Sequence, residues 1–197
     1  MKSWLAEFRR SFLAVAVLAV ILCGLYPLAA WFLAQGLFPG RANGSLVVRE
    51  GVVVGSSLIG QQFSSPKYFH PRPSAAGQGY DAVRSGGTNL GPLSKDLVET
   101  VRRRIAEYRA ENRLAATIPI PADAITASGS GLDPDISPEN ARIQAPRVAR
   151  ARGLAEAVVH AQIEACTEGR TLGILGEPRV NVLRLNLALD GVRDAGR

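Results

Sequence analysis

The longest hydrophobic run of the sequence lies near its amino terminus, where residues 11–40 carry no charge. Over residues 11–34 it reads SFLAVAVLAVILCGLYPLAAWFLA. This is long enough to cross a bilayer, because about 20 apolar residues at about 1.5 Å each span the hydrocarbon core. Pro27 would end a soluble helix, but a spanning helix tolerates it. Aromatic residues near both ends are typical of membrane interfaces: Trp4, Tyr26, Trp31 and Phe32. We therefore predict a transmembrane helix over residues 12–34.

A cleaved signal peptide is the alternative interpretation of this run. Such peptides have apolar cores of about 7–15 residues, followed by a small-x-small cleavage site. The run is longer than that, and its end, AAWFLAQG, offers no such site. A lipoprotein signal would have a small residue before its cysteine, but Leu22 precedes Cys23. The pattern favours an anchor that is retained.

The charges that flank the run predict its orientation. Three basic residues and one acidic residue precede it, namely Lys2, Arg9, Arg10 and Glu7. After it, Arg41 stands alone until Arg49. Positive flanks stay in the cytoplasm. We expect residues 1–11 to be cytoplasmic and residues 41–197 to form an extracytoplasmic domain.

Beyond residue 41, strand-like and helix-like stretches follow one another. Residues 44–60, GSLVVREGVVVGSSLIG, predict two strands around a turn at 49–51. Ser94 is a good N-cap for a helix over residues 95–112, where apolar residues recur at helical spacing. The stretch TIPIPADAI, residues 117–125, is expected to be extended, because its prolines exclude a helix.

The last third of the domain predicts helices and a closing strand. The tripeptide SPE at residues 137–139 is a strong helix start. We expect this helix to break before Pro146, to turn at Gly153 and to run again to about Cys166. Residues 180–189, VNVLRLNLAL, alternate in polarity, which predicts a half-buried strand. The order of elements predicts a mixed α/β (α+β) domain on a single membrane anchor.

A long irregular stretch, residues 64–92, separates the predicted hairpin from the first helix of the domain. It contains four prolines and five glycines, a composition that forbids a long helix or a central strand. A soluble domain rarely keeps such a stretch without a use. Tyr68, Phe69 and Tyr80 suggest that it is held against a surface. The sequence leaves open whether that surface is the domain's own core or a partner.

The stretch TASGSGLDPDIS, residues 126–137, concentrates hydroxyl residues, glycines and aspartates. It lacks the lysine of a phosphate-binding loop and the G-x-S-x-G pattern of a nucleophile elbow. The two histidines of the chain, His70 and His160, lie elsewhere, which disfavours a catalytic triad or a zinc site. We predict a rigid turn before a capped helix, with no catalytic residue and no metal ligand. A membrane-anchored hydrolase that uses this Ser/Asp-rich loop is the alternative.

Charge and cysteine content narrow the functional classes further. The net charge is +6, and the part after the apolar run carries 20 basic and 16 acidic residues, a net +4. Its basic residues are spread among acidic ones without stacking aromatics, which argues against nucleic acid as a partner. Cys23 lies in the apolar run and Cys166 far along the domain, so we expect a hydrophobic core rather than a disulfide to hold the domain together.

Several segments resemble the signature segments of the KdpC family, in that family's order: SLIGQQF…YFHPRPSA, SGGTNLGP, TASGSGLDPDIS, QAPRVARARG and LGEPRVNVLRLNLALD. KdpC is the C subunit of the bacterial Kdp potassium-transporting ATPase. The resemblance implies an accessory subunit of the cell inner membrane, with the lipid bilayer around its anchor and no firmly bound cofactor. It implies a channel-like KdpA subunit, a P-type ATPase subunit KdpB and a small KdpF as partners. Potassium is then the transported ion.

The resemblance also implies roles for particular residues. The family is described as a catalytic chaperone that raises the ATP affinity of the ATPase subunit, with a glutamine near the QAPRV segment involved. By position this implies nucleotide binding by Gln144 and Arg147. A docking or structural motif is expected from Arg72, Asn89, Ser128, Gly129, Ser130, Gly131, Asp133, Pro134, Asn181 and Asn186. The chain carries neither a D-K-T-G phosphorylation motif nor a T-V-G-Y-G filter, so it is neither the phosphorylated nor the pore-forming subunit.

The expected orientation conflicts with the nucleotide role, because it places Gln144 outside the cell, away from the ATP site. We therefore favour a structural or gating role at the outer mouth of the potassium subunit. ATP binding through the complex stays open as what the family resemblance implies. A positively charged domain repels cations in general. Any local action on potassium would then fall to Asp133 and Asp135, and we expect docking to dominate over it.

Overall fold

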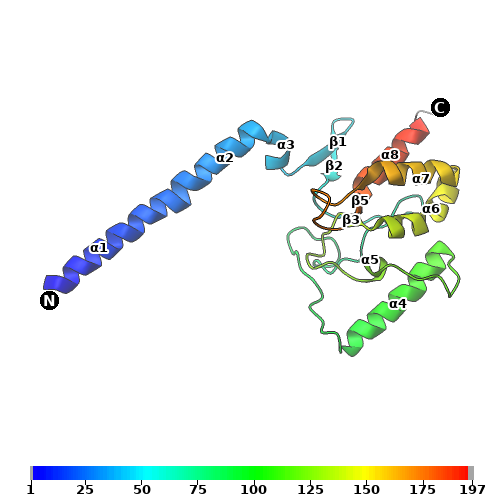
Figure 1. The fold of residues 1–197 in the computed structure, drawn as a ribbon, viewed down its shortest axis with the longest axis horizontal. Coiled ribbons are helices and arrows are strands. Elements are labelled where there is room, and N and C mark those ends of the chain that lie inside the picture. The colour runs from blue at the N-terminus through cyan, green and yellow to red at the C-terminus, as the bar shows by residue number, and fades with distance from the viewer. Residues whose placement is uncertain (1, 195–197) are drawn as a thin grey trace. The chain divides into compact units, whose positions relative to one another are not determined.

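The structure, a computed structural model, describes residues 2–194 and forms two compact units, residues 1–46 and 47–197 (Figure 1). The first unit is helical: α1 (Lys2–Ala19), the π-helical η1 (Val20–Leu25), α2 (Tyr26–Leu37) and α3 (Pro39–Ala42). Among the described residues, Trp4–Leu37 is the one helix long and apolar enough to cross a membrane, and its most apolar window has no buried residue. The predicted amino-terminal apolar helix is confirmed.

Pro27 lies in the first turn of α2 and does not end the helix. A proline removes one backbone donor, and its ring clashes with the carbonyl four residues earlier. That carbonyl belongs to Cys23, which lies inside η1. The wider winding of a π-helix accommodates such an interruption, so the helix continues past the proline.

The predicted β-hairpin follows and is confirmed as β1 (Leu46–Arg49) and β2 (Val52–Ser56). Glu50 and Gly51 connect the strands with φ values of 51° and 79°. Two left-handed residues in a two-residue connection are typical of a hairpin turn of type I′. Residues 57–94 follow without a helix or strand and are called the irregular segment below.

The helix predicted over residues 95–112 is confirmed at both ends. The prediction for the stretch after it, residues 117–125, is wrong in part. In α4 (Lys95–Asn112), the Ser94 side chain accepts a hydrogen bond from the backbone of Leu97 at 3.4 Å. The stretch predicted to be extended contains a short helix, α5 (Ala122–Ile125). Pro121 restricts the residue before it but not the turn after it, so a helix can start there.

The prediction that Pro146 breaks a helix is wrong. Helix α6 (Pro138–Arg152) runs through it, starting at the Ser137 cap and ending at Gly153 with a φ of 67°. The proline removes one intrahelical hydrogen bond. Ala145 and Val148, on either side of it, are fully buried in the core, and this packing keeps the segment helical. Helix α7 (Glu156–Cys166) follows as predicted.

The predicted closing strand is also wrong. A short strand β5 (Arg179–Asn181) gives way to helix α8 (Val182–Asp194). The most deeply buried apolar residues of this helix are Val182, Leu185 and Leu189, spaced at three and four residues. The same residues also alternate in polarity, with leucine at every second position. That alternation predicted a strand, whereas the buried residues follow the helical period.

The core lies between α6, α7 and α8 and a small antiparallel sheet of order β3-β5-β4 (Figure 1). Strands β3 (Asp135–Ile136) and β4 (Thr167–Glu168) flank β5, so Val180 faces both Ile136 and Thr167. The buried cluster consists of Phe69, Ile136, Ala141, Ala145, Val148, Ala149, Val159, Ile163, Val180, Val182, Leu185 and Leu189. The mixed helix-and-sheet fold is confirmed.

Candidate functional site

Two buried amide side chains hold the irregular segment by its backbone. Gln144 of α6 accepts a hydrogen bond from the N–H of His70 at 2.8 Å and donates one to its carbonyl at 3.1 Å. Asn186 of α8 accepts from the N–H of Phe69 at 2.8 Å and donates to its carbonyl at 3.1 Å. Both amides are 1% exposed. They occupy the positions that a neighbouring strand would take, while the Phe69 ring fills the core.

Arg147, one turn along α6 from Gln144, extends this attachment. Its guanidinium donates to the carbonyls of Pro66 and Tyr68 at 2.8 and 3.0 Å. It also donates to Gln144 Oε1 at 2.7 Å and to Asn112 Oδ1 at 3.0 Å. The side chain is 6% exposed, and its burial lowers the pKa of Arg147. We call Gln144, Arg147 and Asn186 the backbone clamp.

A carboxylate completes the clamp from α4. Glu111 accepts from His70 Nδ1 at 2.8 Å and lies 3.6 Å from Arg147 Nε. The hydrogen bond from His70 holds the pKa of Glu111 below its usual value. Partial burial acts in the opposite direction, and electrostatic attraction to His70 and Arg147 lowers the pKa further. The carboxylate is therefore ionised at neutral pH and links α4 to α6 and the irregular segment.

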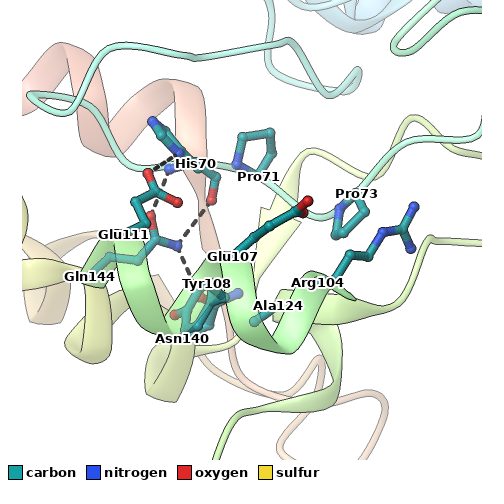
Figure 2. A pocket seen from close by; sticks show the side chains of 10 residues that line it. All are labelled: His70, Pro71, Pro73, Arg104, Glu107, Tyr108, Glu111, Ala124, Asn140 and Gln144. Atoms are coloured by element: carbon teal, nitrogen blue, oxygen red, sulfur yellow. Dashed lines mark hydrogen bonds and ion pairs between the residues drawn. The ribbon is translucent and has the colours of Figure 1, made fainter. Parts of the chain in front are cut away.

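A hollow of about 230 Å³ lies beside the clamp (Figure 2). Its lining includes His70, Glu111, Tyr108 and Gln144. Figure 2 shows the Gln144 amide turned towards the His70 backbone and Asn140, to whose Oδ1 it donates at 2.9 Å. The polar groups of Gln144 are thus engaged with protein atoms.

A second polar network fixes the start of α6. Asp123 accepts hydrogen bonds from the N–H of Ser137 at 2.7 Å, from its hydroxyl at 2.9 Å and from Asn140 Nδ2 at 3.0 Å. The Tyr108 hydroxyl donates to Asn140 Oδ1 at 2.7 Å, and burial raises the pKa of Tyr108. Together these residues connect α4, α5 and α6 behind the clamp.

The loop over residues 126–137 is a second attachment surface for the irregular segment. Arg72 donates to Asp133 at 3.0 Å, and the Ser74 hydroxyl donates to the Gly131 carbonyl at 2.6 Å. The N–H of Gly86 donates to the Ser130 carbonyl at 2.8 Å. The segment predicted to be held against a surface is therefore held by its own domain, and the question left open by the sequence is answered for these residues.

Gly131 stands where this surface is tightest. Its φ is +68°, and a Cβ there would lie 2.6 Å from both the Ala76 nitrogen and the Gly86 oxygen. The backbones of the two segments also approach closely at a second point, because a Cβ on Gly87 would lie 3.0 Å from the Gly129 carbonyl oxygen. Glycine is required at residue 131 for conformation and for space.

The serines of this loop form no catalytic constellation with the described residues. The Ser128 hydroxyl is buried without a hydrogen-bond partner there, and the Ser130 hydroxyl accepts from the N–H of Leu132 at 3.1 Å. His70 lies in the irregular segment and is held by the clamp, and His160 lies in α7. No group of three or more potential metal-ligating residues occurs in the described part of the chain. The hydrolase alternative finds no support in this geometry.

The two aspartates of the loop also have internal partners. Asp133 binds Arg72 and accepts from the N–H of Asp135 at 3.0 Å. Asp135 accepts from Asn181 Nδ2 at 3.1 Å and lies 3.3 Å from Arg179, while its burial raises the pKa of Asp135.

The remaining predicted residues differ in their surroundings. Asn181 also donates to the Ser57 carbonyl at 2.9 Å and accepts from the N–H of Arg184 at 3.1 Å, which caps α8. Pro134 accepts from the N–H of Val182 at 3.0 Å. Asn89 is exposed with a φ of 51°. The structure thus brings Gln144, Arg147 and Asn186 together at the clamp and most of the others at the loop, and Asn89 joins neither group.

Sequence reasoning did not identify Glu111, Asp123 and Asn140. A signal was present in α6, where Asn140, Gln144 and Arg147 are polar positions on a helix face that also carries Ala141, Ala145 and Val148. Polar residues at helical spacing among small apolar ones indicate a buried network.

Fold and site together define a class: a domain on a candidate membrane-spanning helix, whose buried polar side chains fix a long irregular segment. The family model for KdpC, described as the c chain of the K+-transporting ATPase, matches residues 8–191. The chain belongs to this family, as the resemblance of its segments predicted.

Curated relatives agree with the family model. A potassium-transporting ATPase KdpC subunit of Caulobacter vibrioides is 54% identical over 187 residues, which cover 94% of this chain and 93% of the relative. The subunit of the same name from Mycobacterium tuberculosis H37Rv is 55% identical over 174 residues, covering 88% and 92%. That of Rhodopseudomonas palustris is 53% identical over 199 residues, covering 94% and 97%.

Proposed function

We propose that the chain is the accessory, non-catalytic subunit of an ATP-driven potassium uptake complex, and that its helix-and-sheet domain acts by docking. In this proposal the domain lies outside the bacterial inner membrane, over the potassium-translocating subunit. The partners are a KdpA-like subunit, a KdpB-like P-type ATPase subunit and a small KdpF-like subunit. Family membership and the basic flank before the apolar helix support this arrangement.

The observation that carries the docking role is the backbone clamp. Gln144 and Arg147 are the residues that a nucleotide role would require, and both are buried with their polar groups bound to residues 66–70 and to each other. Contact with ATP would break these bonds, and each buried polar group left unpaired costs about 1–3 kcal/mol. We infer that Gln144 positions the irregular segment, so that its loss affects ATP use only through folding and assembly.

The test compares Gln144→Leu with Asn186→Leu in the complete complex. Each change removes one amide and leaves the backbone groups of His70 or Phe69 without their partner. We expect both variants to lower the melting temperature of the full-length chain in detergent and the yield of assembled complex. In the complex that does assemble, KM for ATP should be unchanged in both.

Gln62→Leu is the matched control, because Gln62 is exposed. It should leave both melting temperature and assembly at wild-type values. A Gln144→Leu complex that assembles fully and melts normally but has a raised KM for ATP, with Asn186→Leu normal in all three, would establish a nucleotide role and refute the proposal.

A further inference from the structure

The connection between β4 and β5 displays three large apolar side chains within four residues. Leu172 is 85% exposed, Ile174 75% and Leu175 57%. Single exposed apolar residues are normal on a protein surface, whereas a cluster of them is informative. We call residues 171–175 the apolar tip.

The apolar tip is an ordered turn. Thr171 and Leu175 exchange both backbone hydrogen bonds, at 2.9 and 3.0 Å. Between them, Leu172 and Gly173 have φ values of 56° and 78°, and the N–H of Ile174 donates to the Thr171 carbonyl at 3.3 Å. Such turns favour Asn, Asp or Gly at both central positions. A leucine in this conformation is strained, and strain of this kind points to a use of the side chain.

Paired charges surround the base of the tip. Arg170 binds both carboxylate oxygens of Glu177, at 2.9 and 2.7 Å. Glu168 binds Arg179 at 2.8 Å and Arg184 at 3.0 Å. The basic side chains at the base therefore already have acidic partners. Residues 170–178 also contain no lysine, tryptophan or tyrosine.

This composition distinguishes two possible environments of the tip. Attachment to a lipid surface relies on unpaired basic residues and on interfacial aromatics. An apolar centre with a polar rim, here one whose charges are paired, is instead the anatomy of a protein–protein interface. The chain belongs to a family whose members are one chain of a multi-chain ATPase, so protein partners are expected.

We propose that the apolar tip inserts Leu172, Ile174 and Leu175 into an apolar groove on another subunit of the potassium-transporting ATPase complex. This inference rests on the proposed function, since it requires that the chain assembles with that complex. The strained turn presents the side chains in fixed positions, so little conformational freedom is lost on binding.

The test measures rebinding of the purified full-length chain, in detergent, to a complex prepared without it. Replacing both Leu172→Asn and Ile174→Ser removes the apolar side chains, while Asn tolerates the left-handed conformation. We expect at least a tenfold weaker Kd, typical of the loss of central apolar anchors. The melting temperature should not fall, because these side chains are exposed and Asn relieves the strain at residue 172. The matched control is Val83→Ser with Leu93→Ser, which are 93% and 95% exposed outside the tip and should bind as wild type.

Other occupants give different results, each of which overturns the proposal. Wild-type affinity in the tip variant shows that the tip is not an interface. Quenching of a Leu175→Trp reporter by brominated lipids in the reconstituted complex identifies lipid as the occupant. A wild-type chain that dimerises in sedimentation, with a monomeric tip variant, identifies a second copy. Failure of the wild-type chain itself to rebind refutes the proposed function instead, so the two failures are distinguishable.

Discussion

At the scale of single residues, Gln144 and Asn186 each bind both backbone groups of one residue, on adjacent positions of the irregular segment. A segment rich in proline cannot pair with a strand, because proline lacks the backbone donor. Side-chain amides supply a donor and an acceptor together, which matches one peptide residue. The segment is thereby ordered without regular secondary structure.

Gly131 gives the first prediction at this scale. Gly131→Val should destabilise the full-length chain by at least about 2 kcal/mol, because a β-branched residue resists the positive φ and its Cβ meets backbone atoms of Ala76 and Gly86. Ser128→Ala should be close to neutral, since the buried hydroxyl has no partner among the described residues. Thermal unfolding in detergent measures both. Loss of complex activity in Ser128→Ala with a normal Gly131→Val would favour chemistry at the loop.

The second prediction concerns pH. The pKa of Glu111 in the folded chain lies below its ordinary value of 4.5, chiefly because His70 donates to it. Its stabilising contribution is therefore present above that value and is lost as the pH falls through the lowered folded pKa. The stability difference between wild type and Glu111→Gln should be largest near neutral pH and shrink between about pH 5 and pH 3.

Urea unfolding of the full-length chain across this pH range measures the difference. Glu107→Gln is the control, because the Glu107 side chain is 64% exposed. Its ion pair with Arg103 is long, at 3.9 Å, and lies in solvent. Its difference from wild type should be small at every pH. A difference for Glu111→Gln that grows towards acid pH would contradict the assigned sign.

At the scale of elements, the sequence predicted the features that depend on neighbouring residues, namely helix caps and the hairpin turn. Ser94 and Ser137 cap helices as expected, and residues 46–56 form the hairpin. Three predictions were wrong. At Pro146 and at residues 182–189, packing overrides a local pattern, and at residues 122–125 a helix starts directly after Pro121. The clamp was beyond prediction from periodicity, because its partners are 74 and 117 residues apart in the chain. Gln144, Arg147 and Asn186 were found only through the resemblance to a family.

Asn181 gives a prediction at this scale, because it caps α8 and ties it to the loop. Asn181→Ala should cost about 1–2 kcal/mol, the usual loss for a helix cap with a further hydrogen bond. Asn181→Ser should recover part of this, since a hydroxyl can still accept from the N–H of Arg184. Equal stability of the two variants would show that the cap contributes nothing.

At the scale of the whole molecule, the loop carboxylates are bound within the fold, which supports the proposal that the domain acts by docking. Asp133 and Asp135 are bound to Arg72, Arg179 and Asn181. Asp133→Asn and Asp135→Asn should therefore each cost about 1 kcal/mol locally and leave the potassium affinity of the assembled complex nearly unchanged. A large loss of potassium affinity in a fully assembled variant would show that these carboxylates act on the ion.

The central claim, docking from outside the cell, depends on which side of the membrane the domain occupies. The direct measurement is labelling of Leu93→Cys by a membrane-impermeant maleimide, in a chain carrying Cys23→Ser and Cys166→Ser. Leu93 is 95% exposed, so reagent access depends on the side of the membrane and on any partner covering it. The account predicts labelling in intact spheroplasts, whereas Ser3→Cys in the basic flank is labelled only after lysis. Labelling of Ser3→Cys in intact spheroplasts, with Leu93→Cys protected until lysis, would place the domain in the cytoplasm and contradict the account.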